Sequence, residues 1–494
     1  MNKEIKKILL VVPPYTILRT EPKTAHVPLG LGYIAANIEK AHSVKILDAH
    51  AEGFASESPV GKDRFRYGLA FEEIAERIKD YQPEVVGVSC LFDTQSGNAH
   101  KVLEIAKSVD PQIVTIMGGA HPSVVPEYTL QDQYVDYVII GEADHTFPQF
   151  LKALKDGGVE KTDGIAYRTN GKININPKTS FIQSLDSLPF PARHLLNMDM
   201  YFKINQPMGS VSRLAPNTPL ITSRGCPAQC IFCSIHSVWG RRFRPRSPQS
   251  VLDEIQFLID TYGVREVQFE DDNLIFEKKR AIAIFDGMVE RNFNLLWSTP
   301  NGVAAWALDE EILEKMKASG CYRVTIGIES GDEYVLKNIV RKPLKLDTVK
   351  PLVKKVKKLG METQGYFVVG FPGETKGQIK RTFAFARSLS LDYLTVCFAT
   401  PRAGTELYRI AIEKGYLKNP IDFDTLSVRT TSIETPDFSA RELERIFARH
   451  YLIYALHSVV RNPVHFLRVM IRKLRTDPLF FYTFIKDMLL KKAL

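Results

Sequence analysis

Short runs rich in Val, Ile and Leu alternate with amphipathic segments over the first 155 residues of the chain. The runs predict buried strands at residues 7–12, 44–47, 85–89, 113–117 and 137–140. The segments between them repeat apolar positions every three or four residues and predict helices at 29–41, 71–81, 99–109 and 146–154. Because such alternation favours a parallel doubly wound sheet, we expect residues 1–155 to form a five-stranded, flavodoxin-like (Rossmann-type) α/β domain.

A second alternating region extends from residue 216 to about residue 435. Its predicted strands are residues 220–223, 266–270, 297–299, 324–329, 365–369 and 393–399. Helices are expected between them, at 248–262, 278–291 and 309–318 among other places. Six such units predict a partial (β/α)6 barrel, in which chemistry takes place at the carboxyl ends of the strands. The intervening residues 156–215 are expected to be a linker with a hairpin at Asn170-Gly171, and residues 436–494 a helical extension.

Composition indicates a globular protein with ordinary solubility. Hydrophobic residues make up 45% of the 494 residues and charged residues 24%. No apolar run approaches the roughly 18 residues of a transmembrane helix, and the apolar segment before Pro13 is too short for a signal peptide. We therefore expect a cytoplasmic protein.

The net charge of +9 is concentrated at the C-terminus. Residues 457–494 contain eight Lys and Arg against two Asp, whereas the rest of the chain is nearly neutral. This distribution predicts no nucleic-acid partner. Residues 463–475 combine helical apolar spacing with a basic stripe, and an aromatic cluster follows at 480–484. The pattern suits either a helix on an anionic membrane surface or a helix packed on the barrel with a solvated basic face.

Three of the six cysteines lie within eight residues, at Cys226, Cys230 and Cys233. Such clustering in a cytosolic chain indicates metal or redox chemistry. A structural zinc site needs four ligands, and His236 is the candidate for a fourth. An iron–sulfur cubane held by three thiolates instead keeps one iron open for a substrate. We favour the cubane and keep the zinc site as the alternative.

The Cys-x3-Cys-x2-Cys spacing resembles the signature of the radical S-adenosylmethionine (SAM) superfamily. Further segments resemble, in order, the branch of that superfamily with an N-terminal cobalamin-binding domain. They are GRRFRPRSP at 240–248, FEDDN at 269–273, GIESG at 327–331, VGFPGET at 369–375 and PRAGT at 401–405. The resemblance therefore covers the whole chain.

The resemblance implies a [4Fe-4S] cluster on the three cysteines, with SAM on its open iron. The side chains implied in SAM binding lie on the cysteine loop and at the ends of predicted barrel strands. They are Phe232 beside the adenine, Asp271 and Asp272 on the ammonium, Glu329 on the ribose, and Gly370 and Gly373 against the adenine. Arg244 and Arg246 either pair with carboxylates or solvate a loop.

For the N-terminal domain, the resemblance implies cobalamin bound at the carboxyl ends of the strands. The expected contacts are Ser89, Gly118, Gly119, His121, Gly141 and Glu142. The segment from Asp48 to Gly53 also matches an Asp-x-His-x-x-Gly pattern that supplies a cobalt-ligating histidine in some cobalamin proteins. That pattern follows the first strand in those proteins, but here it follows the second, so we favour a loop histidine at His50.

These features together predict cobalamin-dependent methylation of an unactivated carbon, after reductive cleavage of SAM to a 5′-deoxyadenosyl radical. The expected substrate is a small molecule, either hydrophobic (a lipid, isoprenoid or pigment) or a secondary metabolite, and the electron donor a flavodoxin or ferredoxin. A membrane-bound tail would favour a lipid or isoprenoid. The alternatives are cobalamin-dependent ring formation or rearrangement, and a non-catalytic cobalamin or iron–sulfur sensor. A methylthiotransferase is disfavoured because a second cysteine triad is absent.

Overall fold

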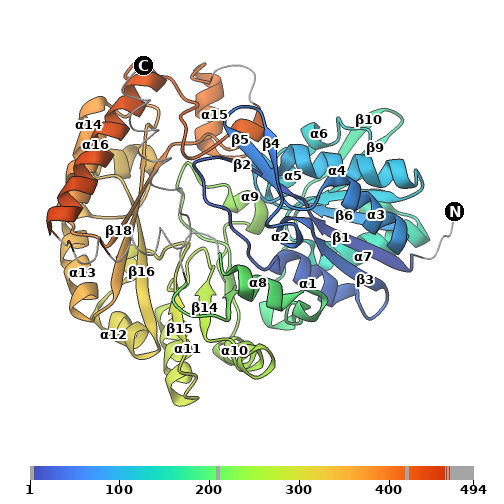
Figure 1. Cartoon of the computed structure of the whole chain (residues 1–494), viewed down its shortest axis with the longest axis horizontal. Coiled ribbons are helices and arrows are strands. Elements are labelled where there is room, and N and C mark those ends of the chain that lie inside the picture. The colour runs from blue at the N-terminus through green and yellow to red at the C-terminus, as the bar shows by residue number, and fades with distance from the viewer. Residues whose placement is uncertain (1–4, 207–211, 418–421, 462, 464–466, 468–494) are drawn as a thin grey trace.

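The computed structural model describes residues 5–206, 212–417, 422–461, 463 and 467. Two α/β units lie side by side, the N-terminal one in blue and cyan and the second in yellow and orange (Figure 1). Each unit is built around its own sheet, as the two regions of alternating pattern predict.

The first sheet contains seven strands in the order β10-β9-β8-β7-β6-β1-β3. Five of them are parallel: β1 (Lys7–Val12), β3 (Ser43–Asp48), β6 (Val85–Ser89), β7 (Val114–Gly118) and β8 (Tyr137–Ile139). Their order, second-first-third-fourth-fifth, is that of flavodoxin-like domains. The predicted fold class is therefore confirmed for this unit.

Helices cover both faces of this sheet. Alternate side chains of β1 point to opposite sides: Leu9 and Val11 pack with α3 (Phe71–Tyr81) and α4 (Ser96–Val109). Ile8 and Leu10 pack with α1 (Leu29–Ile38) and α7 (Ala143–Asp156). Because both faces are buried, the strand reads as a continuous apolar run.

The hairpin at Asn170-Gly171 joins β9 (Ile165–Thr169) to β10 (Lys172–Asn176). Both turn residues have left-handed backbone angles, with φ of 51° and 73°, as a type I′ turn requires. Its strands continue the first sheet antiparallel to β8, rather than standing in a separate linker.

The sequence did not indicate a second, three-stranded sheet of β2 (Tyr15–Leu18), β5 (Arg64–Tyr67) and β4 (Glu57–Val60). All four residues of β4 are exposed, so it lacks the alternation that marks a half-buried strand.

The second sheet has six parallel strands in sequence order, as a partial barrel requires. They are β11 (Asn217–Leu220), β14 (Glu266–Phe269), β15 (Leu296–Ser298), β16 (Cys321–Glu329), β17 (Glu362–Val369) and β18 (Tyr393–Phe398). The helices between them are α10 (Pro248–Tyr262), α11 (Lys278–Glu290), α12 (Glu310–Ala318), α13 (Leu346–Lys358) and α14 (Lys376–Ser388). β11 and β18 do not pair with each other, so the barrel stays open.

The last described helix, α16 (Ala440–Arg461), lies beside α14 (Figure 1). Leu443 is fully buried against the barrel core, and Phe447 packs on the same core. Most of the predicted amphipathic tail at 463–475 and all of the aromatic cluster at 480–484 lie outside the described residues. No described helix is both long enough and apolar enough to cross a membrane.

Candidate active site

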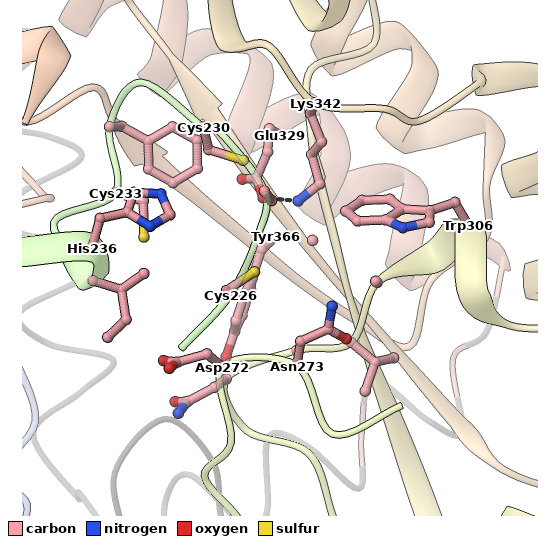
Figure 2. A pocket seen from close by; sticks show the side chains of 18 of the residues that line it. Cys226, Cys230, Cys233, His236, Asp272, Asn273, Trp306, Glu329, Lys342 and Tyr366 are labelled. Carbon is pink, nitrogen blue, oxygen red and sulfur yellow. Dashed lines mark hydrogen bonds and ion pairs between the residues drawn. The ribbon is translucent and has the colours of Figure 1, made fainter. Parts of the chain in front are cut away.

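A cavity of about 390 Å³ lies beyond the carboxyl ends of β14, β15 and β16 (Figure 2). Cys226, Cys230 and Cys233 line it together with Phe232, so the structure brings the predicted cluster loop to the predicted end of the barrel. Its remaining walls carry both polar and apolar side chains. They include His236, Asp272, Asn273, Asn301, Trp306, Glu329, Lys342 and Tyr366.

The cysteine loop follows the two-residue strand β12 (Ser223–Arg224) and ends at α9 (Ile235–Trp239). Gly225 has φ of +82°, and a Cβ there would lie 2.4 Å from the carbonyl oxygen of Arg242, so this turn requires glycine. Burial raises the pKa of Cys230 to about 11 and that of Cys233 to about 12. These thiols therefore need a bound metal centre to be held as thiolates at neutral pH.

The site chemistry fits an iron–sulfur cluster with a polar ligand. Three thiol side chains face one cavity, and the carboxamide oxygen of Asn273 is buried there without a hydrogen-bond partner in the described part of the chain. Buried polar atoms need such partners, and SAM carries donors and acceptors that can supply them. Within the described residues, no three His, Cys, Asp or Glu side chains converge closely enough to hold a single metal ion.

Glu329 and Lys342 form an ion pair on the cavity wall, with 2.7 Å between Oε1 and Nζ. Glu329 ends β16 in a left-handed conformation with φ of 66°, at a shift in register against β17. Such backbone strain in a residue other than glycine is characteristic of functional sites. A Cβ at Gly327 would approach the carboxylate of Glu329 to 2.8 Å and the ammonium of Lys342 to 2.9 Å, so glycine makes room for the pair.

No pattern in the sequence indicates Lys342 as a site residue. It lies on a loop after the short π-helix Val335–Val340, where no hydrophobic period singles out one basic residue. Its ammonium is 5.7 Å from the centre of the Trp306 ring, a second cavity residue that the sequence pattern did not indicate. Only the folded chain shows that a cation faces the cysteine loop.

The structure separates the two predicted ammonium ligands. Asp272 lines the cavity, and burial together with the charge of Asp271 raises its pKa to about 7. The carboxylate of Asp271 instead accepts hydrogen bonds from the backbone and hydroxyl of Thr222 and from the hydroxyl of Ser223. Asp271 is not among the cavity-lining residues, and it ties the end of β14 to the segment before the cysteine loop.

Gly370 and Gly373 are not among the cavity-lining residues either. Both have positive φ, of 90° and 85°, in the turn after β17. The Glu374 carboxyl group closes that turn: its Oε2 accepts the backbone N–H of Gly370 at 2.7 Å and of Phe371 at 3.1 Å. A Cβ at Gly370 would lie 2.5 Å from the Leu443 side chain of α16. These contacts show turn geometry and packing, so the predicted contact with adenine stays a prediction.

In the first unit, His121 is the second residue of the short helix α5 (Ala120–Val124), and only 1% of its surface is exposed. Its Nδ1 lies 2.8 Å from the carboxylate of Asp93, whose other oxygen accepts a hydrogen bond from Arg402 at 3.0 Å. Arg402 belongs to the loop after β18. The buried histidine therefore contributes to a contact between the two units.

Gly118 ends β7 and Gly119 follows it, and Ser89 pairs with Gly118 across the sheet. Gly119 has φ of +111°, and a Cβ there would lie 2.5 Å from the Cys90 carbonyl oxygen. Gly141, after β8, has φ of +71°. These residues do lie at the strand ends, and their role in holding cobalamin remains a prediction.

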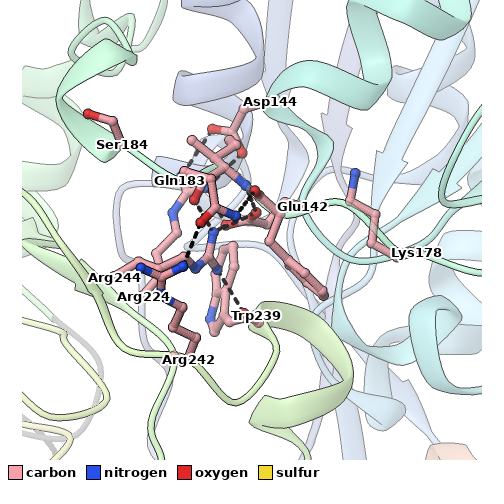
Figure 3. A network of polar contacts seen from close by, with 12 residues as sticks. Glu142, Asp144, Lys178, Gln183, Ser184, Arg224, Trp239, Arg242 and Arg244 are labelled. Carbon is pink, nitrogen blue, oxygen red and sulfur yellow. Dashed lines mark hydrogen bonds and ion pairs between the residues drawn. The ribbon is translucent and has the colours of Figure 1, made fainter.

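Glu142 is not exposed at the strand end. It is buried in an ion cluster with Arg224 and Arg244 (Figure 3). This pairing also decides between the two interpretations of Arg244, which binds a carboxylate rather than solvating a loop. Arg246 likewise pairs with a carboxylate, that of Glu254. The sequence could not show these pairings because the partners come from separate segments.

Comparison with known proteins places the chain in a family. The B12 binding domain model matches residues 15–151, and the Radical SAM superfamily model matches residues 220–386. The chain is 37% identical over 448 residues to cytidylyl-2-hydroxyethylphosphonate methyltransferase of Streptomyces wedmorensis, which covers 84% of this chain and 83% of that protein. An uncharacterized methyltransferase of Pyrococcus horikoshii is 32% identical, over 92% of this chain and 94% of its own. Anaerobic magnesium-protoporphyrin IX monomethyl ester cyclase of Rubrivivax gelatinosus is 27% identical, over 81% of this chain and 71% of its own.

Two solved structures share the fold. The radical SAM methyltransferase TsrM from Kitasatospora setae aligns with a TM-score of 0.65 at 17% identity, over 84% of this chain and 77% of that one. The cobalamin-dependent SAM radical enzyme OxsB was solved with aqua-cobalamin and SAM. It aligns with a TM-score of 0.69 at 16% identity, over 99% of this chain and 72% of that one.

Fold, cysteine loop and relatives agree on one class, the radical SAM enzymes that carry cobalamin. The chain belongs to the B12-binding-domain radical SAM enzyme family. Its cofactors are a [4Fe-4S] cluster, SAM and cobalamin, as the sequence predicted. Membership of an enzyme family also rejects the sensor hypothesis.

Proposed function

We propose that this enzyme transfers a methyl group from SAM, by way of cobalamin, to an unactivated carbon of a small-molecule substrate. The observation that carries the proposal is the 37% identity over 84% of the chain to a relative named as a methyltransferase. A cavity that joins the three thiols to charged and apolar side chains supports it. When bound, the cluster supplies the electron that cleaves SAM, and cobalamin supplies the methyl group.

The chain's own residues hold and orient SAM in this proposal. Cys226, Cys230 and Cys233 bind the cluster. We assign the Lys342 ammonium to the SAM carboxylate and the Asp272 carboxylate to the SAM ammonium, because both side chains line the cavity and opposite charges form charge-assisted hydrogen bonds. Glu329 accepts the ribose hydroxyls, and Phe232 lies against the adenine. Trp306 and Tyr366 line the same cavity, where their rings take the place of water beside these charges; a lower local dielectric would strengthen the electrostatic contacts.

The decisive experiment uses anaerobically reconstituted, cobalamin-loaded protein, a chemical reductant and SAM with a trideuterated methyl group. Methyl transfer predicts S-adenosylhomocysteine together with extracted cobalamin that carries the deuterated methyl group. The same preparation of Cys230→Ser should form no 5′-deoxyadenosine, because the cluster loses a ligand. A preparation that cleaves SAM to 5′-deoxyadenosine yet never labels cobalamin contradicts the proposal. It would favour ring formation, the reaction named for the relative that is 27% identical.

Reduction of the cluster needs a donor, for which we propose a flavodoxin or ferredoxin. In a reaction without chemical reductant, reduced flavodoxin should restore formation of 5′-deoxyadenosine. Failure of both flavodoxin and ferredoxin, in a preparation that is active with dithionite, would contradict this donor class.

We further propose that the end of α16 contacts an anionic membrane surface. Ile453, Leu456 and Val460 lie on one helix face with 38%, 59% and 84% of their surface exposed. Arg449 and Arg445 are exposed one and two turns before Ile453 on that face, and eight Lys and Arg fall within the last 38 residues. Apolar side chains flanked by cations match the interface of a bilayer with negative headgroups.

Vesicle sedimentation tests this contact. The protein should sediment with phosphatidylglycerol vesicles but not with phosphatidylcholine vesicles, and 0.5 M salt should weaken binding. Leu456→Asp with Val460→Asp should abolish sedimentation. Ile412→Asp, at an exposed apolar residue of α15 (Glu406–Glu413), should leave it unchanged. Equal binding to both vesicle types, or loss of binding in the control, would contradict the contact.

A further inference from the structure

We infer that Arg224 is a positioning residue that orients the cysteine loop from the first sheet unit. The inference rests on the proposed use of the cavity for the cluster and SAM. Arg224 is two residues before Cys226 and is 4% exposed, and it belongs to β12. Its guanidinium donates to Asp144 through both terminal nitrogens, at 2.8 and 3.0 Å, and to Glu142 at 3.2 Å. Both acceptors belong to the start of α7, in the other unit (Figure 3).

The far end of the cysteine loop meets the same ion cluster. Arg244 lies opposite Arg224 in the ladder of β12 with β13 (Arg244–Pro245). It donates to the Glu142 carboxylate at 2.8 Å and to the carbonyl oxygen of Trp239 at 2.7 Å. Trp239 is the last residue of α9, the helix after Cys233, and the Arg224 guanidinium lies 4.7 Å from its ring centre. The loop is thus fixed on both sides by two arginines that share the Glu142 carboxylate, and Arg224 also binds Asp144.

The geometry of these contacts indicates that Arg224 orients the cysteine loop and does not only hold it by charge attraction. A two-pronged Arg–carboxylate contact sets the plane of the guanidinium as well as its distance. Lysine would keep the positive charge but offers a single point donor, so it would lose that plane. Removing charge from one partner would leave the other charge buried and less well compensated. The proximity of Arg224 holds the pKa of Asp144 below its ordinary value, so the carboxylate is ionised at neutral pH.

A second contact supports a path from the first unit to the loop. Helix α5 follows the end of β7 and packs against α9. The loop after β18 also meets α5, since a Cβ at Gly404 would lie 2.6 Å from the Val124 side chain. The cysteine loop is therefore placed by elements of the first unit as well as by the barrel.

The test compares Arg224→Lys with Arg193→Lys in the reconstituted full chain. Arg193 is a matched control because it too is buried and pairs with a carboxylate, Glu254 at 2.7 Å, but it supports β11 rather than the loop. The measurement is the electron paramagnetic resonance spectrum of the reduced cluster before and after addition of SAM. We expect Arg224→Lys to keep its iron content and melting temperature while the fraction of SAM-shifted signal falls about fivefold. Arg193→Lys should give the wild-type response.

Asp144→Asn serves as the second variant, because it neutralises the partner from the other unit and does not touch the cavity. It should reduce the SAM-shifted fraction as Arg224→Lys does. A wild-type response in both variants at full iron content overturns the inference, as does an equal loss in Arg193→Lys. A wild-type protein whose signal never responds to SAM overturns the proposed function itself, which is a distinct result.

Discussion

Tyr15 and His50 stack face to face in the interior of the first unit, with ring centroids 3.7 Å apart and ring planes inclined by 11°. The Nε2 atom of His50 lies 3.1 Å from the hydroxyl of Tyr67, and only 1% of the residue is exposed. Burial lowers the pKa of His50 to about 3, so the imidazole is neutral. These contacts favour a packing role for His50, because its ring stacks on Tyr15 and its Nε2 faces the Tyr67 hydroxyl.

We therefore predict that His50→Asn binds cobalamin with the stoichiometry and absorption spectrum of the wild type. Its melting temperature should fall by several degrees, because the stacked ring is lost. Tyr15→Leu is the control: its melting temperature should fall by a similar amount, and its absorption spectrum should also be unchanged. A spectral shift confined to the His50 variant would instead identify it as a cobalt ligand.

Lys342→Met should weaken SAM binding about tenfold, which corresponds to roughly 1.4 kcal/mol. The variant keeps the length of the side chain but removes the cation and leaves the Glu329 carboxylate without its partner. Anaerobic equilibrium dialysis with labelled SAM measures the change. Lys315→Met, which breaks a half-exposed ion pair with Asp286, should bind SAM normally. Unchanged affinity in Lys342→Met at full iron content would remove Lys342 from the site.

The buried carboxyl group of Glu374 should make the stability of the protein depend on pH. Burial raises the pKa of this carboxyl from 4.5 to about 8, with a smaller contribution from Asp332. Between pH 4.5 and 8 the folded protein holds a proton that the unfolded chain releases, so the free energy of unfolding contributed by this group falls as pH rises. Glu374→Gln keeps an oxygen acceptor for the two backbone N–H groups but does not titrate.

Relative to the wild type, Glu374→Gln should therefore gain melting temperature as pH increases from 5 to 8. Scanning calorimetry of the protein without cofactors would measure this gain, and Glu444→Gln on α16 provides the control. A constant difference between the variant and the wild type over this range would show that Glu374 is ionised in the folded chain.

The adjacent residues Gly118 and Gly119 should respond differently to alanine. At Gly119 the backbone is left-handed and a Cβ would meet the Cys90 backbone, so Gly119→Ala should cost about 2 kcal/mol or more. At Gly118 a Cβ would lie 3.8 Å from the Ile139 side chain, an ordinary contact. Hydrogen exchange of β6 and β7 would compare the two variants. Equal protection in both would contradict the conformational requirement at Gly119.

Much of the fold could be predicted because its elements carry local signals. Residues 71–81 and 85–89 were predicted with the bounds that the structure shows, since the first repeats apolar positions at helical spacing and the second is a short apolar run. The three-stranded sheet escaped prediction because its pairing depends on distant segments. β4 carries no buried residue, and its partner β5 alternates over only four residues.

The candidate site could be predicted only where a motif is compact. The cysteine spacing is contained in eight residues, so it located the cavity. The roles of Asp271 and Glu142 depend on partners far away in sequence: Asp271 binds Thr222, and Glu142 binds Arg224, which is 82 residues further along the chain. No local pattern contains that information, and for the same reason Lys342 was missed.

Three arginines of the barrel unit, Arg224, Arg244 and Arg402, take their carboxylate partners from the N-terminal unit. An isolated fragment of residues 216–435 would lack those partners, and the three arginine side chains would be exposed to solvent, two of them on strands that flank the cysteine loop. Dissection into halves is therefore a poor strategy for this enzyme, and whole-chain substitutions will report more faithfully on its chemistry.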